Sequence, residues 1–153
     1  MKARASGEPA KAADEIPPGR APLFQRLHMN GDHRALAEAG AQAAFERVTY
    51  HDSCYLGRYA DVYDEPRAVI EAVGELLEPA STRENALCCG SSVANTAISD
   101  GQQVQIARSV AAQLDATGAE VIVTACPLCK KAIGRGTKSE VRDLAEIVVA
   151  AIK

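Results

Sequence analysis

The chain of 153 residues contains no tryptophan, two phenylalanines and four tyrosines. Its core must therefore be built mainly from alanine, valine, isoleucine and leucine, which bury little apolar area each. A bound metal could for that reason supply a large share of the folding free energy, as structural metals do in small domains. The length suits one domain with a core of its own.

Strong charge and long apolar runs are also missing. The net charge is −3 without any block of like charges, so the electrostatic footprint of a nucleic-acid-binding protein is absent. No run approaches the roughly 18 apolar residues of a membrane span. Residues 1–7 are not followed by the apolar stretch of a secretory signal. We expect a cytoplasmic protein, with contact to a membrane only through a partner.

The N-terminal part is unlike the rest of the chain. Residues 1–22 hold four of the seven prolines and few large apolar residues, which predicts a flexible tail. Residues 23–46 predict a helical lead-in, since Leu36 and Ala43 follow Asp32 at helical spacing. All the cysteines lie in residues 47–153, which we expect to form a single folded domain.

From residue 47 onward, short β-prone runs alternate with helical patterns. The strands are expected at residues 48–51, 85–87 and 121–125, and the helices at residues 66–77, 100–114 and 139–152. The last of the strands is continuously apolar, as in strands covered on both faces. This alternation is typical of an α/β fold with a largely parallel sheet flanked by helices.

The helices have recognisable start and end signals. Pro66 suits the first turn of a helix, and Pro79 ends that helix. Asp100 followed by Gln103 resembles a capping box, and Gly118 is placed to end the same helix. These signals support the helical assignments.

Five cysteines occur in three groups, each directly after an expected strand: Cys54, then Cys88 and Cys89, then Cys126 and Cys129. Ligands of parallel sheets gather at the carboxyl ends of the strands, so we expect the three groups to form one site. An odd number of thiols cannot pair completely, and adjacent cysteines are poor disulfide partners. A metal or cluster site is therefore favoured over a disulfide framework.

The residues around the thiols suit ligation. Pro127 is placed as a first helical residue, which puts Cys129 in the first turn, where free N–H groups and the helix dipole favour a thiolate. Gly90 supplies the sharp turn that lets both adjacent thiols face one centre and lets backbone N–H groups approach the sulfurs. Five thiolates exceed the four ligands of tetrahedral zinc and favour an iron–sulfur cluster.

The spacing C-x33-C-C-G-x35-C-x-x-C, with HDSCYLGR at residues 51–58 and VTACPLC at residues 123–129, resembles the cysteine-rich CCG domain. That domain occurs in subunits of heterodisulfide reductase, in the iron–sulfur subunits of glycolate oxidase, in anaerobic glycerol-3-phosphate dehydrogenase and in electron-transfer-flavoprotein-linked proteins. The resemblance covers residues 47–152.

The resemblance implies a function as well as a fold. It implies an electron-transfer subunit that exchanges electrons with a flavoprotein or another iron–sulfur subunit. The ligands of its [4Fe–4S] cluster, which is non-cubane in heterodisulfide reductase, would be Cys54, Cys88, Cys89, Cys126 and Cys129, with Gly90 as the backbone turn.

Three features depart from the family pattern. The chain has one copy of the domain and no C-x2-C-x2-C-x3-C ferredoxin run, so we expect a partner chain with a second CCG or ferredoxin-like domain. Ser91, Ser92 and Val93 stand where glycines commonly follow the CCG. Ser53 stands where the family often has proline. Turnover is accordingly expected to need partner subunits.

Two other functions stay open on the residues alone. One is a structural or regulatory zinc module that uses four of the cysteines. The other is a dithiol–disulfide oxidoreductase acting through Cys126 and Cys129.

The residues around Cys54 receive lesser roles. His51 is expected to pack or to hydrogen-bond rather than to bind metal, with proton handling as its alternative. The tyrosines within residues 55–63 are expected to pack in the core or to contact a partner. Arg58 and Arg67 are expected to be solvated, with charge balance of a cluster as an alternative for Arg58.

Overall fold

The computed structural model describes residue 36, residues 40–91 and residues 97–152. The strands of the described part are β1 (Arg47–His51), β2 (Glu75–Leu77), β3 (Val121–Thr124) and β4 (Glu140–Asp143). All pairings are parallel, in the order β2-β1-β3-β4. The helices are α3 (Asp64–Glu71), α4 (Asp100–Asp115), α5 (Pro127–Gly134) and α6 (Leu144–Ala151), with a short π-helix η1 (Tyr55–Tyr59) and a 3-10 helix η2 (Arg83–Asn85). The predicted α/β fold with a parallel sheet is confirmed.

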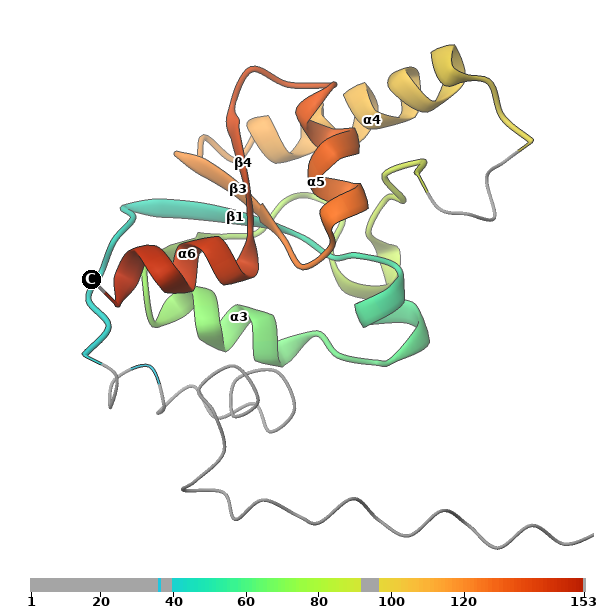
Figure 1. Cartoon of the computed structure of the whole chain (residues 1–153). Helices are drawn as coiled ribbons and strands as arrows, with labels where there is room; N and C mark the ends of the chain where they lie inside the picture. Colours follow the sequence, from blue (N-terminus) through green and yellow to red (C-terminus); the bar gives the residue numbers. More distant parts are fainter. Residues whose placement is uncertain (1–35, 37–39, 92–96, 153) are drawn as a thin grey trace, which may run out of the picture.

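Helices cover both faces of the sheet, with α3 and α6 on one side and α4 and α5 on the other (Figure 1). Val121 and Val123 of β3 belong to the core beneath α3 and α6, whereas Ile122 belongs to the core beneath α4 and α5. Neighbouring side chains of a strand point to opposite faces. The continuous apolar sequence of β3 is therefore explained by burial on both faces.

The prediction of a helix at residues 66–77 is wrong for the second half of this range. α3 ends at Glu71, and Glu75–Leu77 form β2, which pairs with residues 47–49 of β1. The chain passes the start of β1 closely at Gly74, where a Cβ atom would lie 2.8 Å from the carbonyl oxygen of Phe45. The two leucines of β2 fit a helical stripe as well as a short strand, and pairing with β1 decides between them.

The helix expected at residues 139–152 is also wrong in its first part, because residues 140–143 form β4 and pair with β3. Asp143 caps the helix that follows. Its carboxylate accepts from the backbone N–H of Ala145 at 3.0 Å, and its own N–H donates to Glu146 at 2.7 Å. This capping box starts α6 at Leu144 and separates it from the strand.

The strand expected at residues 85–87 is not formed. Residues 83–85 are the 3-10 helix η2, and residues 86–89 have no partner strand in the described part of the chain. The other two expected strands are confirmed as β1 and β3. The helix expected at residues 100–114 is confirmed as α4, but its capping box uses Ser99 and Gln102 rather than Asp100 and Gln103.

The N-terminal predictions fall mostly outside the described residues. The tail at residues 1–22 lies wholly outside them, as does most of the lead-in at residues 23–46. Leu36 is buried against β1, α3 and α6, and residues 41–45 form no helix. Among the described residues, no helix combines the length and the apolar character needed to cross a membrane.

The contact between α4 and the turn after α5 gives a stability test. A Cβ atom at Gly136 would lie 2.7 Å from the carbonyl oxygen of Ala107, whereas a Cβ atom at Gly134 would meet nothing within 4 Å. We expect Gly136→Ala to lower the free energy of unfolding by about 1–3 kcal/mol because α4 must move. Gly134→Ala, the control, should be neutral or raise it by up to about 1 kcal/mol. Urea denaturation checks both values, and equal stabilities of the two variants would contradict the packing described.

Candidate metal centre

The three cysteine groups come together where β1 and β3 end. The two strands are neighbours in the sheet, so the segments that follow them start side by side. Cys54 follows β1, and Cys126 follows β3 as the N-cap of α5. Pro127 opens α5 and Cys129 lies in its first turn, as the sequence predicts.

Cys88 and Cys89 reach this place from a loop rather than from a strand. The loop turns at Gly90, whose φ of +81° lies in the left-handed region that favours glycine. The sulfur of Cys89 lies 3.2 Å from the sulfur of Cys129, and both residues are buried in the core beneath α4 and α5. The expected sharp turn at Gly90 is confirmed.

The thiols lie in one another's electrostatic field. The hydrogen bond with Cys129 lowers the pKa of Cys89 to about 6, and further hydrogen bonds from the Ser91 backbone and from Cys88 act in the same direction. The same contact with Cys89, together with burial, raises the pKa of Cys129. Burial raises the pKa of Cys54, and the charges of Cys88, Cys89 and Cys126 raise it further. The five thiols therefore lie close enough to influence one another's ionisation, and their role as joint ligands stays a prediction.

The donor set fits a thiolate-bound cluster. Soft thiolates select iron–sulfur clusters and zinc, and clusters of several irons take their ligands on different metal atoms. A zinc site instead needs four ligand atoms around one point. Among the described residues, no three Cys, His, Asp or Glu side chains are grouped so as to hold a single metal ion.

Ser53 adds an unpartnered donor beside the first cysteine. Its side chain is buried, and its hydroxyl has no hydrogen-bond partner among the described residues. A buried hydroxyl normally finds an acceptor, because leaving it without one costs free energy. The sulfur atoms of a cluster site offer such acceptors next to Cys54.

His51 is buried and uses both ring nitrogens within the protein. Nε2 lies 3.1 Å from the carbonyl oxygen of Leu87, and Nδ1 lies 3.2 Å from the hydroxyl of Thr124. A carbonyl oxygen only accepts, so Nε2 carries the proton. Burial lowers the pKa of His51, which keeps the ring neutral near pH 7. The packing and hydrogen-bonding role expected for this residue is the one observed.

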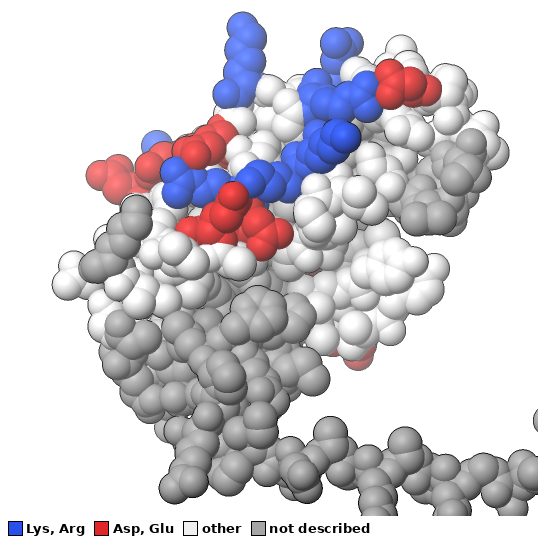
Figure 2. Space-filling model, viewed as in Figure 1, with Lys and Arg blue, Asp and Glu red and all other residues white. Residues whose placement is uncertain are grey.

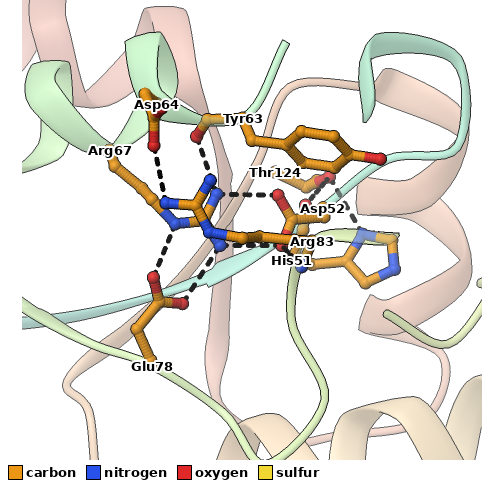
Figure 3. A network of polar contacts seen from close by, with 8 residues as sticks. All are labelled: His51, Asp52, Tyr63, Asp64, Arg67, Glu78, Arg83 and Thr124. Atoms are coloured by element: carbon orange, nitrogen blue, oxygen red, sulfur yellow. Dashed lines mark hydrogen bonds and ion pairs between the residues drawn. The ribbon is translucent and has the colours of Figure 1, made fainter. Parts of the chain in front are cut away.

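Arg67 is buried, which contradicts the solvated position expected for it. Its guanidinium binds both carboxylate oxygens of Asp52 at 2.8 Å and also contacts Glu78 (Figure 3). Burial opposes ionisation of Asp52, but the hydrogen bonds from Arg67 and from the backbone of Arg83 outweigh it and lower the pKa of that carboxyl group. The sequence does contain a signal for the burial of Arg67. Ile70 follows it three positions later, so both side chains lie on the same face of α3.

Arg58 is exposed but not free. Its Nε donates to the carbonyl oxygen of Glu84 at 3.2 Å, and its guanidinium also donates to the carbonyl oxygen of Ala86. The sequence predicts solvent exposure of Arg58, which is observed, but it does not predict that Arg58 also binds the segment that leads to Cys88.

Large apolar side chains are exposed beside the cysteines. Tyr55, Leu87 and Leu128 each neighbour a cysteine in sequence, and each is at least 40% exposed. Tyr59 is exposed too and stacks on Tyr55 with ring centroids 5.2 Å apart. Figure 2 shows mostly uncharged surface at the place of η1, whereas the Lys and Arg side chains in this view lie over β4 and α5, next to Asp and Glu side chains. The prediction that Tyr55 and Tyr59 pack in the core is therefore wrong, and their contact with a partner stays a prediction.

The turn at Gly90 can be tested against a second glycine with positive φ. Alanine at either Gly90 or Gly118 must adopt a left-handed backbone, which costs about 1–2 kcal/mol. Only at Gly90 would the new Cβ atom also lie 3.0 Å from Ile106, since nothing lies within 4 Å at Gly118. We expect Gly90→Ala to destabilise the metal-free chain by up to about 1 kcal/mol more than Gly118→Ala. Urea denaturation measures the difference, and a smaller loss for Gly90→Ala would contradict the geometry.

The unpartnered hydroxyl of Ser53 gives a second test. We expect Ser53→Ala to leave the metal-free chain as stable as before or to stabilise it by about 1 kcal/mol, because no hydrogen bond is lost. Thr124→Val is the control, since it removes a hydroxyl bonded to His51 and should destabilise by about 1–3 kcal/mol. Thermal melting without metal measures both, and a destabilised Ser53→Ala variant would show that the hydroxyl has an acceptor in the protein.

Known proteins are similar in sequence to this chain. Residues 48–134 match the family model of the cysteine-rich domain CCG. A Bacillus subtilis protein named "Probable iron-sulfur-binding oxidoreductase FadF" is 38% identical over 62% of the chain. An "EtfAB:quinone oxidoreductase" of Syntrophomonas wolfei is 35% identical over 70% of it. A heterodisulfide reductase subunit of Methanosarcina mazei is 32% identical over 69%.

The similarity is confined to a part of each relative. The aligned regions cover 14% of the Bacillus protein, 17% of the Syntrophomonas protein and 27% of the Methanosarcina protein. No solved structure is significantly similar to the chain. The family model nevertheless spans more than half of the chain and includes all five cysteines. This chain belongs to the cysteine-rich CCG domain family.

Proposed function

We infer that this chain is an electron-transfer module of an oxidoreductase complex and that its five cysteines hold an iron–sulfur cluster. The observation that supports the proposal is the 3.2 Å distance between the sulfurs of Cys89 and Cys129, which come from remote segments. The charges of Cys88, Cys89 and Cys126 also raise the pKa of Cys54, which supports including this third segment. The relatives from Bacillus and Syntrophomonas are named as oxidoreductases, and the first as iron–sulfur-binding.

The residues of the chain have distinct tasks in this proposal. The bound cluster supplies one-electron redox chemistry. The thiolates of the five cysteines hold it, and Gly90 lets the backbone N–H of Ser91 reach the sulfur of Cys89. Hydrogen bonds to cluster sulfurs are one of the levers that a protein has on the reduction potential, and the unpartnered hydroxyl of Ser53 would be a further donor if it reaches a sulfur.

The cluster is proposed to be of the [4Fe–4S] type. A cubane cluster of this type takes four cysteine ligands, one for each iron. Five thiolates would exceed that number, which supports the non-cubane form that the resemblance to heterodisulfide reductase implies.

The proposed partner is a flavoprotein or another iron–sulfur subunit, including a chain with a second CCG or ferredoxin-like domain. Support comes from the exposed apolar side chains of Tyr55, Leu87 and Leu128, each next to a cysteine in the sequence, and of Tyr59, which stacks on Tyr55. Aromatic side chains are enriched at protein interfaces. A partner that covers these residues would exclude water from the cluster and shorten the path for electrons. Such a complex would place the chain in the cytoplasm, at a membrane only through its partner.

Anaerobic purification of the full chain tests the cofactor. We expect a brown protein with about four irons and a comparable amount of acid-labile sulfide per chain, and an electron paramagnetic resonance signal in one redox state. A colourless protein with stoichiometric zinc would support a zinc module instead. A metal-free protein that reduces a model disulfide, and loses this activity in Cys129→Ser, would support the dithiol oxidoreductase.

The ligand role of Cys54 is tested separately. Cys54 is half-buried, so we expect Cys54→Ser to lower the iron content by half or more while the melting temperature of the metal-free chain stays within a few degrees of the wild type. Tyr59→Ser, on the same segment and 79% exposed, is the control and should keep the iron. Iron analysis and thermal melting check both variants. Full iron in Cys54→Ser would remove this residue from the ligand set.

A further inference from the structure

The segment at residues 83–87, which leads to Cys88, is held by side chains from the neighbourhood of Cys54. Asp52 accepts from the backbone N–H of Arg83 at 2.7 Å. Arg58 donates to the carbonyl oxygens of Glu84 and Ala86, and His51 donates to that of Leu87. Four backbone groups of a segment without a strand partner are thus satisfied by three residues within four positions of Cys54.

Two of these residues, Asp52 and His51, are held in place by side chains other than the thiols. Asp52 is fixed by the fork of Arg67, which also binds Glu78 and the carbonyl oxygen of Tyr63 (Figure 3). His51 is fixed by Thr124 of the neighbouring strand β3. The anchor therefore spans β1, α3, the end of β2 and β3, all of which belong to the folded core.

We propose that His51, Asp52 and Arg58 are positioning residues that set Cys88 and Cys89 against Cys54 before any metal binds. The inference rests on the proposed function, since it assigns a purpose to the ligand pocket. Residues 86–90, which lie in no helix or strand, must otherwise be ordered at the moment of binding, at a cost in conformational entropy. Preorganisation by the three side chains removes that cost, as outer-shell partners do at other metal sites.

Arg58 is the residue at which positioning and charge balance can be separated. It is exposed, so its replacement should leave the fold intact, and its planar fork reaches two carbonyl oxygens at once. Lysine keeps the positive charge but lacks the fork. If Arg58 positions the loop, Arg58→Lys should lose the order of the loop and the bound iron to the same extent as Arg58→Gln. If it only balances the charge of a cluster, Arg58→Lys behaves like the wild type.

Arg83→Gln provides a matched control within the same segment. The side chain of Arg83 makes an exposed ion pair with Asp64, and only its backbone N–H contacts Asp52. The control therefore removes a positive charge close to the loop but leaves all four contacts to the segment in place. Any effect that it shares with Arg58→Gln is an effect of charge alone.

The first measurement uses the metal-free full chain. We expect amide hydrogen exchange in residues 84–90 to rise by about tenfold or more in Arg58→Lys and Arg58→Gln, with exchange in β1 and β3 and the melting temperature unchanged. Arg83→Gln should exchange like the wild type in this segment. Wild-type protection in Arg58→Lys overturns the proposal, and this result does not depend on whether the chain binds iron.

The second measurement uses the chain loaded with iron and sulfide under anaerobic conditions. We expect both Arg58 variants to bind less than half of the wild-type iron and to show broadened or shifted electron paramagnetic resonance lines, while Arg83→Gln keeps the wild-type spectrum. Wild-type iron content and spectrum in Arg58→Lys overturn the positioning role at the ligands. A wild-type chain without iron overturns the proposed function, and the exchange measurement then decides alone whether the loop is positioned.

Discussion

The buried ion pair of Arg67 and Asp52 is the interaction on which the rest of the site depends. It joins α3 to the end of β1, and through Glu78 and the backbone of Arg83 it also fixes the end of β2 and the loop that follows. Removing one partner of such a pair leaves an uncompensated buried charge and costs about 3–5 kcal/mol. The pair is fully hydrogen-bonded here, and the carboxylate that it holds lies two residues before Cys54.

The thiols disfavour one another's ionisation, because neighbouring thiolates repel each other. Burial and neighbouring thiols raise the pKa values of Cys54 and Cys129, whereas Cys89 is stabilised as a thiolate by the hydrogen bonds that it receives. Five thiolates cannot accumulate in one place without compensating positive charge. This balance suits the positively charged irons of the proposed cluster. It also explains why hydrogen-bond donors such as the Ser91 backbone are directed at the sulfurs.

Part of the fold followed from local pattern and part did not. The strands β1 and β3 and the helix α4 were predictable, because their apolar periodicity and flanking signals agree with their final environment. The sequence pattern predicts helix for the residues of the short strands β2 and β4, because leucine and valine at those spacings fit both structures. The pattern also predicts a strand at residues 85–87, where the structure has none. Its backbone is satisfied by Arg58 and His51 instead, which no local pattern indicates.

The sequence alone determined the five ligand candidates, the turn at Gly90 and the helical start at Pro127, because these depend on residue type and on close neighbours in the chain. Only the tertiary structure decided that Cys89 lies against Cys129 and that Arg67 is buried on Asp52. Those contacts join residues remote in sequence, and they depend on how β1 and β3 pair and how the helices pack over them. Spacing along a chain does not encode that geometry.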